Sequence, residues 1–108
     1  MSVLEEVAAE RRRQDEKWGE QNHPDGTGTG TEVVPLWYAE DFAEWAKLAT
    51  DASAAAGVVT WREILLEEVA EAFDESDLDK LRTELLQVAA VATQWVEAID
   101  RRRAEPPC

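Results

Sequence analysis

The apolar residues of this chain recur at alternating spacings of four and three, which is the period of an α-helix with one buried face. Two long segments, residues 36–56 and 77–103, keep this repeat over several turns. In the second segment the repeating residues are Leu81, Leu85, Val88, Ala92, Trp95 and Ile99. Because strand side chains alternate with a period of two, so long a repeat favours helices. We therefore predict an all-α fold.

A capping-box pattern, a serine or threonine followed three residues later by a glutamate, marks two further helix starts. These helices are predicted over residues 2–18 and 60–74. Either Ser76 or Asp77 can cap the last helix, whose end at the arginines 101–103 suits the helix dipole. Short connections between the last three helices predict antiparallel neighbours in a four-helix bundle.

Residues 19–35 hold four of the five glycines and two of the four prolines, so no regular period survives there. We expect a flexible loop, which leaves both a lid over a site and plain disorder open. Its Gly-Thr repeat at residues 26–31 lacks the features of a phosphate-binding P-loop and is interpreted as a spacer. No strand is predicted, because Val33–Val34 and Val58–Val59 adjoin proline, glycine or a helix cap.

The chain has 108 residues, the length of one ordinary domain, which we take as residues 1–108. Its formal net charge of -13 argues against a nucleic acid or an anionic membrane as a partner, because both would be repelled. No apolar run reaches membrane-spanning length, and the first residues lack the core of a signal peptide. We therefore expect a cytoplasmic protein. The single Cys108 excludes an internal disulfide.

Four glutamates gather on one side of the helix predicted over residues 60–74. Glu63, Glu67 and Glu71 are spaced four apart, and Glu68 lies three residues before Glu71. Like charges at this spacing destabilise a helix by roughly a few tenths of a kcal/mol per pair. A solvated acidic face is the ordinary explanation. Here the acids are interleaved with apolar residues, which places them beside the buried stripe instead of opposite it.

The next helix carries Glu84 and Gln87 one turn apart, also beside its apolar stripe. A short turn between two helices can bring their acidic faces together. Carboxylate oxygens gathered in this way are typical ligands of a hard divalent cation such as Mg²⁺. We therefore predict a metal site between these two helices.

At this point the sequence resembles a known family. The run EEVAEA at residues 67–72, followed by ELLQ at residues 84–87, is similar to the split EExxE…ExxD signature of MazG-like nucleoside triphosphate pyrophosphohydrolases. The resemblance covers roughly residues 61–99, with a further likeness in the preceding helix and near the start of the chain. It implies hydrolysis of a nucleoside or deoxynucleoside triphosphate to a monophosphate and pyrophosphate, with Mg²⁺, or alternatively Mn²⁺, as the cofactor.

Carried over by position, the resemblance implies metal ligands at the acidic signature residues and at the residue that departs from the signature. These are Glu67, Glu68, Glu71, Glu84 and Gln87. Glu67 and Glu68 are the candidate catalytic carboxylates. Gln87 stands where the family has aspartate, so weaker metal binding, a shifted substrate and loss of catalysis all stay open. Glu63 is a candidate to compensate for the missing charge.

Binding a triphosphate needs positive charge, and a base needs an aromatic surface for stacking. The candidate substrate-binding residues are Arg13, Trp18, Lys47, Lys80 and Arg82. For each, an ordinary surface or packing role is the alternative. Five tryptophans in so short a chain also favour a subunit interface, and we expect a homodimer or homotetramer.

Two functions from other classes remain alternatives. Gln87 favours a catalytically weak or inactive protein that keeps the fold as a nucleotide-binding or protein-interaction module. The net charge alone favours an acidic mimic that occupies the basic surface of a nucleic-acid-binding protein. The only histidine, His23, lies in an Asn-His-Pro-Asp turn and is assigned no catalytic role.

Overall fold

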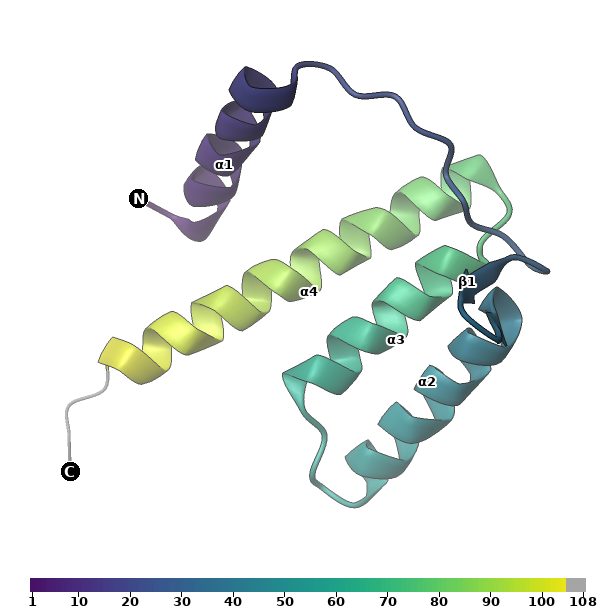
Figure 1. The fold of residues 1–108 in the computed structure, drawn as a ribbon. Coiled ribbons are helices and arrows are strands. Elements are labelled where there is room, and N and C mark those ends of the chain that lie inside the picture. Colours follow the sequence, from purple (N-terminus) through teal and green to yellow (C-terminus); the bar gives the residue numbers. More distant parts are fainter. Residues whose placement is uncertain (105–108) are drawn as a thin grey trace. The chain divides into compact units, whose positions relative to one another are not determined.

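The computed structural model describes residues 1–104. Within them the chain forms α1 (Val3–Trp18), β1 (Glu32–Val34), β2 (Trp37–Tyr38), α2 (Ala39–Ala55), α3 (Trp61–Asp74) and α4 (Leu78–Ala104) (Figure 1). The predicted all-α class is thus confirmed, since both strands are very short. Cys108 lies outside the described residues.

The chain divides into two compact units. One unit covers residues 26–92 and holds the hairpin, α2, α3 and the first half of α4. The other consists of residues 1–25 and 93–104 of the described chain, so α4 belongs to both. The acidic residues of the predicted site all fall in the first of these units.

Small residues form the packed centre of the unit 26–92. Ala39 and Ala46 of α2 and Ala70 and Ala72 of α3 are each at most 2% exposed. Their small side chains leave room for close packing in this unit, in which α2 and α3 run alongside one another (Figure 1). The hydroxyl of Thr50 adds a polar link, because its Oγ1 lies 2.8 Å from the Ala46 carbonyl oxygen and 3.2 Å from that of Glu63. α3 is therefore held firmly on α2.

The helix starts agree with the capping residues in the sequence. Both predicted capping boxes are present, Ser2 with Glu5 and Thr60 with Glu63. At α4 the structure decides between the two candidates, because the Lys80 amide donates to Oδ1 of Asp77 over 2.9 Å. Asp77 is therefore the cap of α4.

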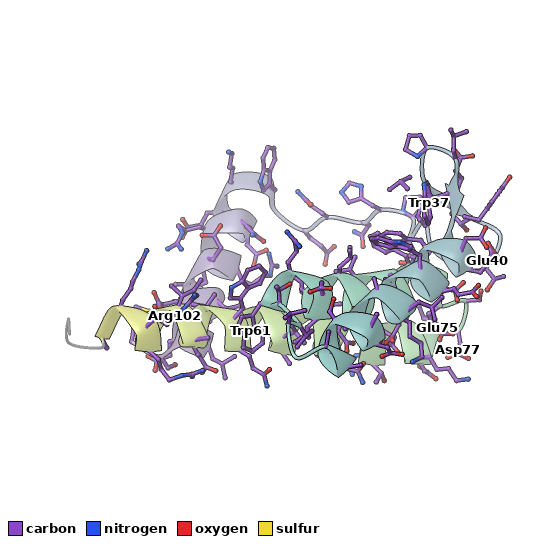
Figure 2. All side chains as sticks on the ribbon, turned by 90° about the horizontal axis from the view of Figure 1, so that it is seen from below. Trp37, Glu40, Trp61, Glu75, Asp77 and Arg102 are labelled. Carbon is purple, nitrogen blue, oxygen red and sulfur yellow. The ribbon has the colours of Figure 1, made fainter. Side chains whose placement is uncertain are left out.

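The prediction of no strands is wrong at residues 32–38. β1 and β2 pair antiparallel, with Val34 opposite Trp37. The helix predicted from residue 36 consequently begins only at Ala39. Trp37 is held by an aromatic cluster, its ring centroid lying 6.3 Å from Phe42 and 6.0 Å from Trp45 (Figure 2). Strand pairing and ring packing here outweigh the helical spacing of apolar residues that begins at Tyr38 in the sequence.

The hairpin turn contains a strained residue. Pro35 and Leu36 connect the strands, and Leu36 has a φ of 71°, the left-handed region that favours glycine. Its side chain is 92% exposed, so it contributes little packing. We expect Leu36→Gly to stabilise the protein by about 0.5–1 kcal/mol in urea unfolding, because it removes this strain. Leu36→Ala keeps the Cβ and is the control; an equal gain in both variants would contradict the strain.

The second half of the predicted loop is anchored to the rest of its unit. The amide of Gly28 donates to the Phe73 carbonyl oxygen at the end of α3 over 2.8 Å. The Ala39 amide at the start of α2 donates to the Thr31 carbonyl oxygen over 2.7 Å. The glycine and threonine run therefore connects two helix ends, whereas residues 19–25 form no helix or strand.

α1 is a highly polar helix with none of its residues buried. Two ion pairs lie along it, Arg11 with Asp15 and Arg13 with Glu10, each at 2.7 Å. Such exposed pairs contribute little to stability. Among residues 1–104 no helix combines the length and the apolar character needed to cross a bilayer.

Candidate metal centre

Buried residues on two sides of α3 flank its acidic face. Ala70 and Ala72 are 0% and 1% exposed, and at about 100° between successive helical residues they lie about 200° apart around the helix. Glu68 and Glu71 fall in the arc between the two alanines. Both side chains are half-buried. They are therefore partly removed from water without being enclosed.

α3 and α4 bring three carboxylates together. One carboxylate oxygen from each of Glu68, Glu71 and Glu84 lies within 4.8 Å of the other two. We call these three residues the acidic cluster. Four of the five predicted ligands thus share this neighbourhood, because Gln87 also reaches it. The remaining one, Glu67, is half-buried on α3 but is not part of the three-carboxylate group.

Gln87 joins two of the acids. With its amide nitrogen turned toward them, it donates to Oε2 of Glu68 and to Oε2 of Glu84, each over 3.1 Å. This orientation is the one that satisfies the hydrogen bonding, because the opposite one would place the amide oxygen against carboxylates. A neutral donor between two like charges lowers their repulsion. The predicted role of Gln87 as a metal ligand would use its amide oxygen and did not include this role as a hydrogen-bond donor, although the spacing of three from Glu84 places both residues on one helix face.

The cluster disfavours its own negative charge. Partial burial, followed by the charges of Glu68, Glu84 and Glu67, raises the pKa of Glu71 to about 7, and a hydrogen bond with Glu84 acts in the same direction. Burial and the charges of Glu84 and Glu67 also raise the pKa of Glu68. Near neutral pH, a proton or a cation is therefore favoured at this place.

A lysine on α2 lies within electrostatic reach of the acids. Lys47 pairs with Asp51, Nζ to Oδ2 at 2.7 Å. That pairing is the main reason why the pKa of Lys47 is raised, and the charges of Glu67 and Glu71 contribute further. Of the predicted cationic residues, Lys47 is therefore the one that interacts electrostatically with the acidic residues of α3.

Glu63 is engaged elsewhere. Its carboxylate accepts from the Thr60 hydroxyl at 2.9 Å and from the Ser53 hydroxyl of α2. These hydrogen bonds, led by that from Ser53, lower the pKa of Glu63. The residue helps to fix the start of α3 and does not join the acidic cluster. The idea that it compensates for Gln87 thus finds no support in its position.

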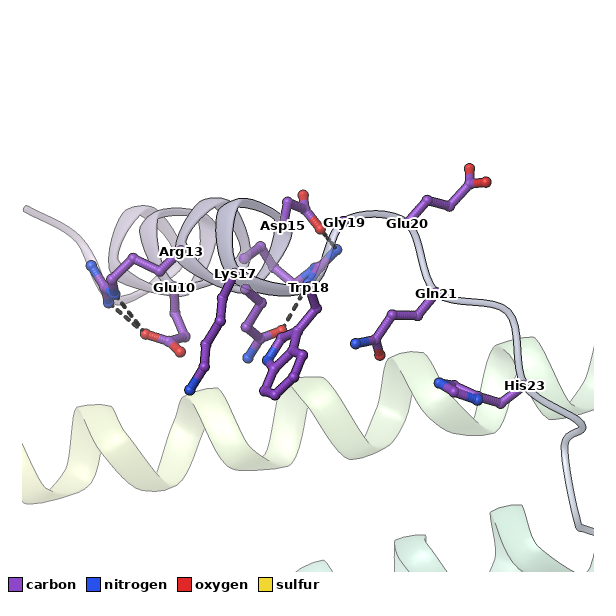
Figure 3. Close-up of a pocket in the computed structure, with 11 residues that line it drawn as sticks. Glu10, Arg13, Asp15, Lys17, Trp18, Gly19, Glu20, Gln21 and His23 are labelled. Atoms are coloured by element: carbon purple, nitrogen blue, oxygen red, sulfur yellow. Dashed lines mark hydrogen bonds and ion pairs between the residues drawn. The ribbon is translucent and has the colours of Figure 1, made fainter.

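The other predicted substrate-binding residues lie apart along the chain. Lys80 and Arg82 are exposed in the first turns of α4. Arg13 and Trp18 line a polar pocket together with Gln21 and His23 (Figure 3). In this pocket the Lys17 ammonium lies 4.8 Å from the Trp18 ring centroid, a cation–π contact. The pocket shares no lining residue with the acidic cluster.

Comparison of the chain with protein-family models, curated proteins and solved structures finds no match. The resemblance to MazG-like proteins therefore rests on the motif residues alone.

Proposed function

We propose that the protein is a divalent-metal-dependent pyrophosphohydrolase of nucleoside or deoxynucleoside triphosphates, of the MazG-like kind. The observation that carries the proposal is the convergence of Glu68, Glu71 and Glu84 from two helices within 4.8 Å. Isolated acidic side chains on a helix face give no reason for such convergence, since like charges repel. A cation bound between them removes that repulsion.

The donor set suits Mg²⁺ or Mn²⁺. Glu68, Glu71 and Glu84 offer carboxylate oxygens only, which are the ligands that these hard ions prefer. When bound, the ion supplies neutralisation of phosphate oxygens and polarisation of the phosphorus centre. Gln87 holds Glu68 and Glu84 by its amide hydrogens, and it supplies no charge of its own. Three acids and one neutral amide thus form the proposed metal site.

Glu67 and Lys47 are assigned the roles in the reaction that the metal ligands do not fill. Glu67 lies next to Glu68 in sequence and outside the three-carboxylate group, so it is available to accept a proton from the attacking water. The water oxygen bonds to the α-phosphorus, the bond from that phosphorus to the bridging oxygen breaks, and pyrophosphate leaves. Lys47 pairs with the triphosphate by exchanging Asp51 for a phosphate oxygen.

A second copy of the chain is part of the proposal, as a homodimer or homotetramer. No large apolar side chain among residues 1–104 is fully buried. Leu85 and Leu86 of α4 are 51% and 56% exposed, close in sequence to Glu84. Covering such residues with a partner helix would remove apolar surface from water. We place this assembly in the cytoplasm.

The test is incubation of the protein with a panel of nucleoside and deoxynucleoside triphosphates and Mg²⁺, measuring pyrophosphate. We expect pyrophosphate and monophosphate in equal amounts, no product with EDTA, and a loss of at least about 100-fold in Glu68→Ala. Glu97→Ala, which removes an exposed carboxylate further along α4, is the matched control and should keep full activity. Release of single phosphates, or activity that survives in Glu68→Ala, would contradict the proposal.

Gln87 favours one second candidate, a nucleotide-binding module of the same fold without turnover. A site with one acid fewer than the family signature carries less negative charge with which to bind the metal ion. Metal-dependent binding of a triphosphate analogue, with no pyrophosphate from any triphosphate tested, would select this candidate.

A further inference from the structure

The turn at Gly28–Thr31 contacts the connection between α3 and α4 directly. The Thr29 amide donates to Oγ of Ser76 over 3.2 Å, and the Thr29 hydroxyl lies 3.2 Å from Oδ1 of Asp74. Together with the bond from the Gly28 amide to the Phe73 carbonyl oxygen, this places the turn on the last two residues of α3 and on Ser76, the second residue after it. The contact spans more than forty positions of sequence.

The same turn also contacts the start of α2. The Gly30 amide donates to Oε2 of Glu40 over 2.8 Å, in addition to the bond from the Ala39 amide to Thr31. Figure 2 shows Glu40, Glu75 and Asp77 at the same end of this unit. The Gly28–Thr31 turn therefore joins the start of α2 to the connection between α3 and α4.

The connection between α3 and α4 is itself held by hydrogen bonds. The Glu75 carboxylate accepts from the amides of Ser76 and Asp77, at 3.1 and 3.0 Å. Asp77 in turn caps α4. The direction in which α4 leaves α3 is thus set by residues 75–77, and Ser76 is the one of them whose side chain contacts the Gly28–Thr31 turn.

Gly28 fits this contact because it has no Cβ. Its φ is +112°, and a Cβ built there would lie 3.1 Å from Oγ of Ser76. Gly28 is also buried. The close approach of the turn to Ser76 therefore depends on glycine at this position, for both its backbone angle and its size.

We propose that Ser76 is a positioning residue for the acidic cluster, which it serves by fixing α4 relative to α3 through the Gly28–Thr31 turn. Glu71 lies three residues before the end of α3 and Glu84 six residues after the start of α4, about 5 Å and about 9 Å along the helices. Since a helix is stiff over this length, a change of direction at Ser76 shifts Glu84 away from Glu68 and Glu71. The effect of Ser76 on metal binding rests on the proposed function, whereas its effect on the acidic cluster does not.

Ser76→Ala removes the hydroxyl, and Ser76→Thr restores one. Ser76 is exposed, so the added methyl group has room in solvent. Thr83→Ala is the matched control, because the Thr83 hydroxyl donates to the Asp79 carbonyl oxygen of its own helix, at 3.2 Å. Far-ultraviolet circular dichroism checks that all variants keep their helices.

The first measurement needs no metal. In a side-chain NOE spectrum of the metal-free protein, we expect cross-peaks between Glu71 and Glu84 in the wild type, Ser76→Thr and Thr83→Ala. In Ser76→Ala they should weaken severalfold. Unchanged cross-peaks in folded Ser76→Ala would overturn the positioning role, whatever the metal does.

The second measurement is Mn²⁺ titration of the same four proteins. We expect an affinity about tenfold lower in Ser76→Ala and restored in Ser76→Thr, in line with losses at residues that orient metal ligands. Equal affinities in Ser76→Ala and the wild type would overturn the link to the metal site. If the wild type binds no Mn²⁺, the proposed function fails, and the NOE result alone decides the positioning role.

Discussion

Glu71→Gln should stabilise the metal-free protein by about 1–2 kcal/mol at pH 8, after allowance for solvent screening, while it weakens Mn²⁺ binding at least about 100-fold. Glutamine keeps the size of the side chain and its ability to hydrogen bond to Glu84. It removes the charge that burial and three neighbouring carboxylates disfavour. A metal ligand is expected to lower the stability of the metal-free protein and to be required for metal binding. A solvated surface acid is expected to do neither.

The sign follows from the direction of the pKa shift. The pKa of Glu71 is raised from 4.5 to about 7 in the folded protein. Between these values the folded state keeps a proton that the unfolded chain has released, so the stability of the wild type falls as the pH rises through this window. Below it both states are protonated, and wild type and Glu71→Gln should be equally stable. Glu68, whose pKa is also raised, adds to the same trend.

Urea unfolding in EDTA between pH 5 and pH 8 measures this difference. The two proteins should coincide near pH 5 and separate toward pH 8. The lowered pKa of Glu63 acts only below its ordinary value of 4.5, outside this range. Glu97→Gln is the control for a general effect of net charge. If Glu71→Gln were less stable than the wild type at pH 8, the Glu71 carboxylate would not be destabilised by its neighbouring carboxylates, contrary to the prediction.

Gln87→Glu should change metal affinity in the opposite direction. We expect Mn²⁺ to bind about 10- to 100-fold more tightly at pH 8, because a fourth carboxylate joins the three already present. The same change should destabilise the metal-free protein by at least about 1 kcal/mol. It replaces the amide that donates to Glu68 and Glu84 with another negative charge.

Gln94→Glu is the matched control for Gln87→Glu. It adds the same charge two turns further along α4, at an exposed glutamine. Titration calorimetry with Mn²⁺ and unfolding in EDTA should show no change in this control beyond about 0.5 kcal/mol. Tighter binding in both variants would indicate a general attraction of cations to an acidic protein. Unchanged binding in Gln87→Glu would show that residue 87 does not face a metal site.

The sequence predicted the helices well because their starts are determined locally. Ser2 with Glu5 and Thr60 with Glu63 lie within one helical turn of each other, and the structure has both capping boxes. The hairpin at residues 32–38 was missed for the opposite reason. It depends on Leu36 adopting a positive φ and on Trp37 packing against α2, neither of which a residue pattern indicates.

The candidate site was predicted in outline but not in detail. The spacing of the acids on two consecutive helices was enough to predict that Glu68, Glu71 and Glu84 lie close together. It did not show that Ser53 of α2 binds the Glu63 carboxylate, because that contact is made between helices. Nor did it show that Gln87 turns its nitrogen toward the acids, since that depends on where their oxygens lie after packing.

A crystal structure with Mn²⁺, using the anomalous signal of the ion, tests directly whether the acidic cluster binds a divalent cation. We expect a peak bonded to carboxylate oxygens of Glu68, Glu71 and Glu84, with the ion contacted from both α3 and α4. An anomalous map without a peak there at millimolar Mn²⁺, with the three side chains separated by water, would contradict it.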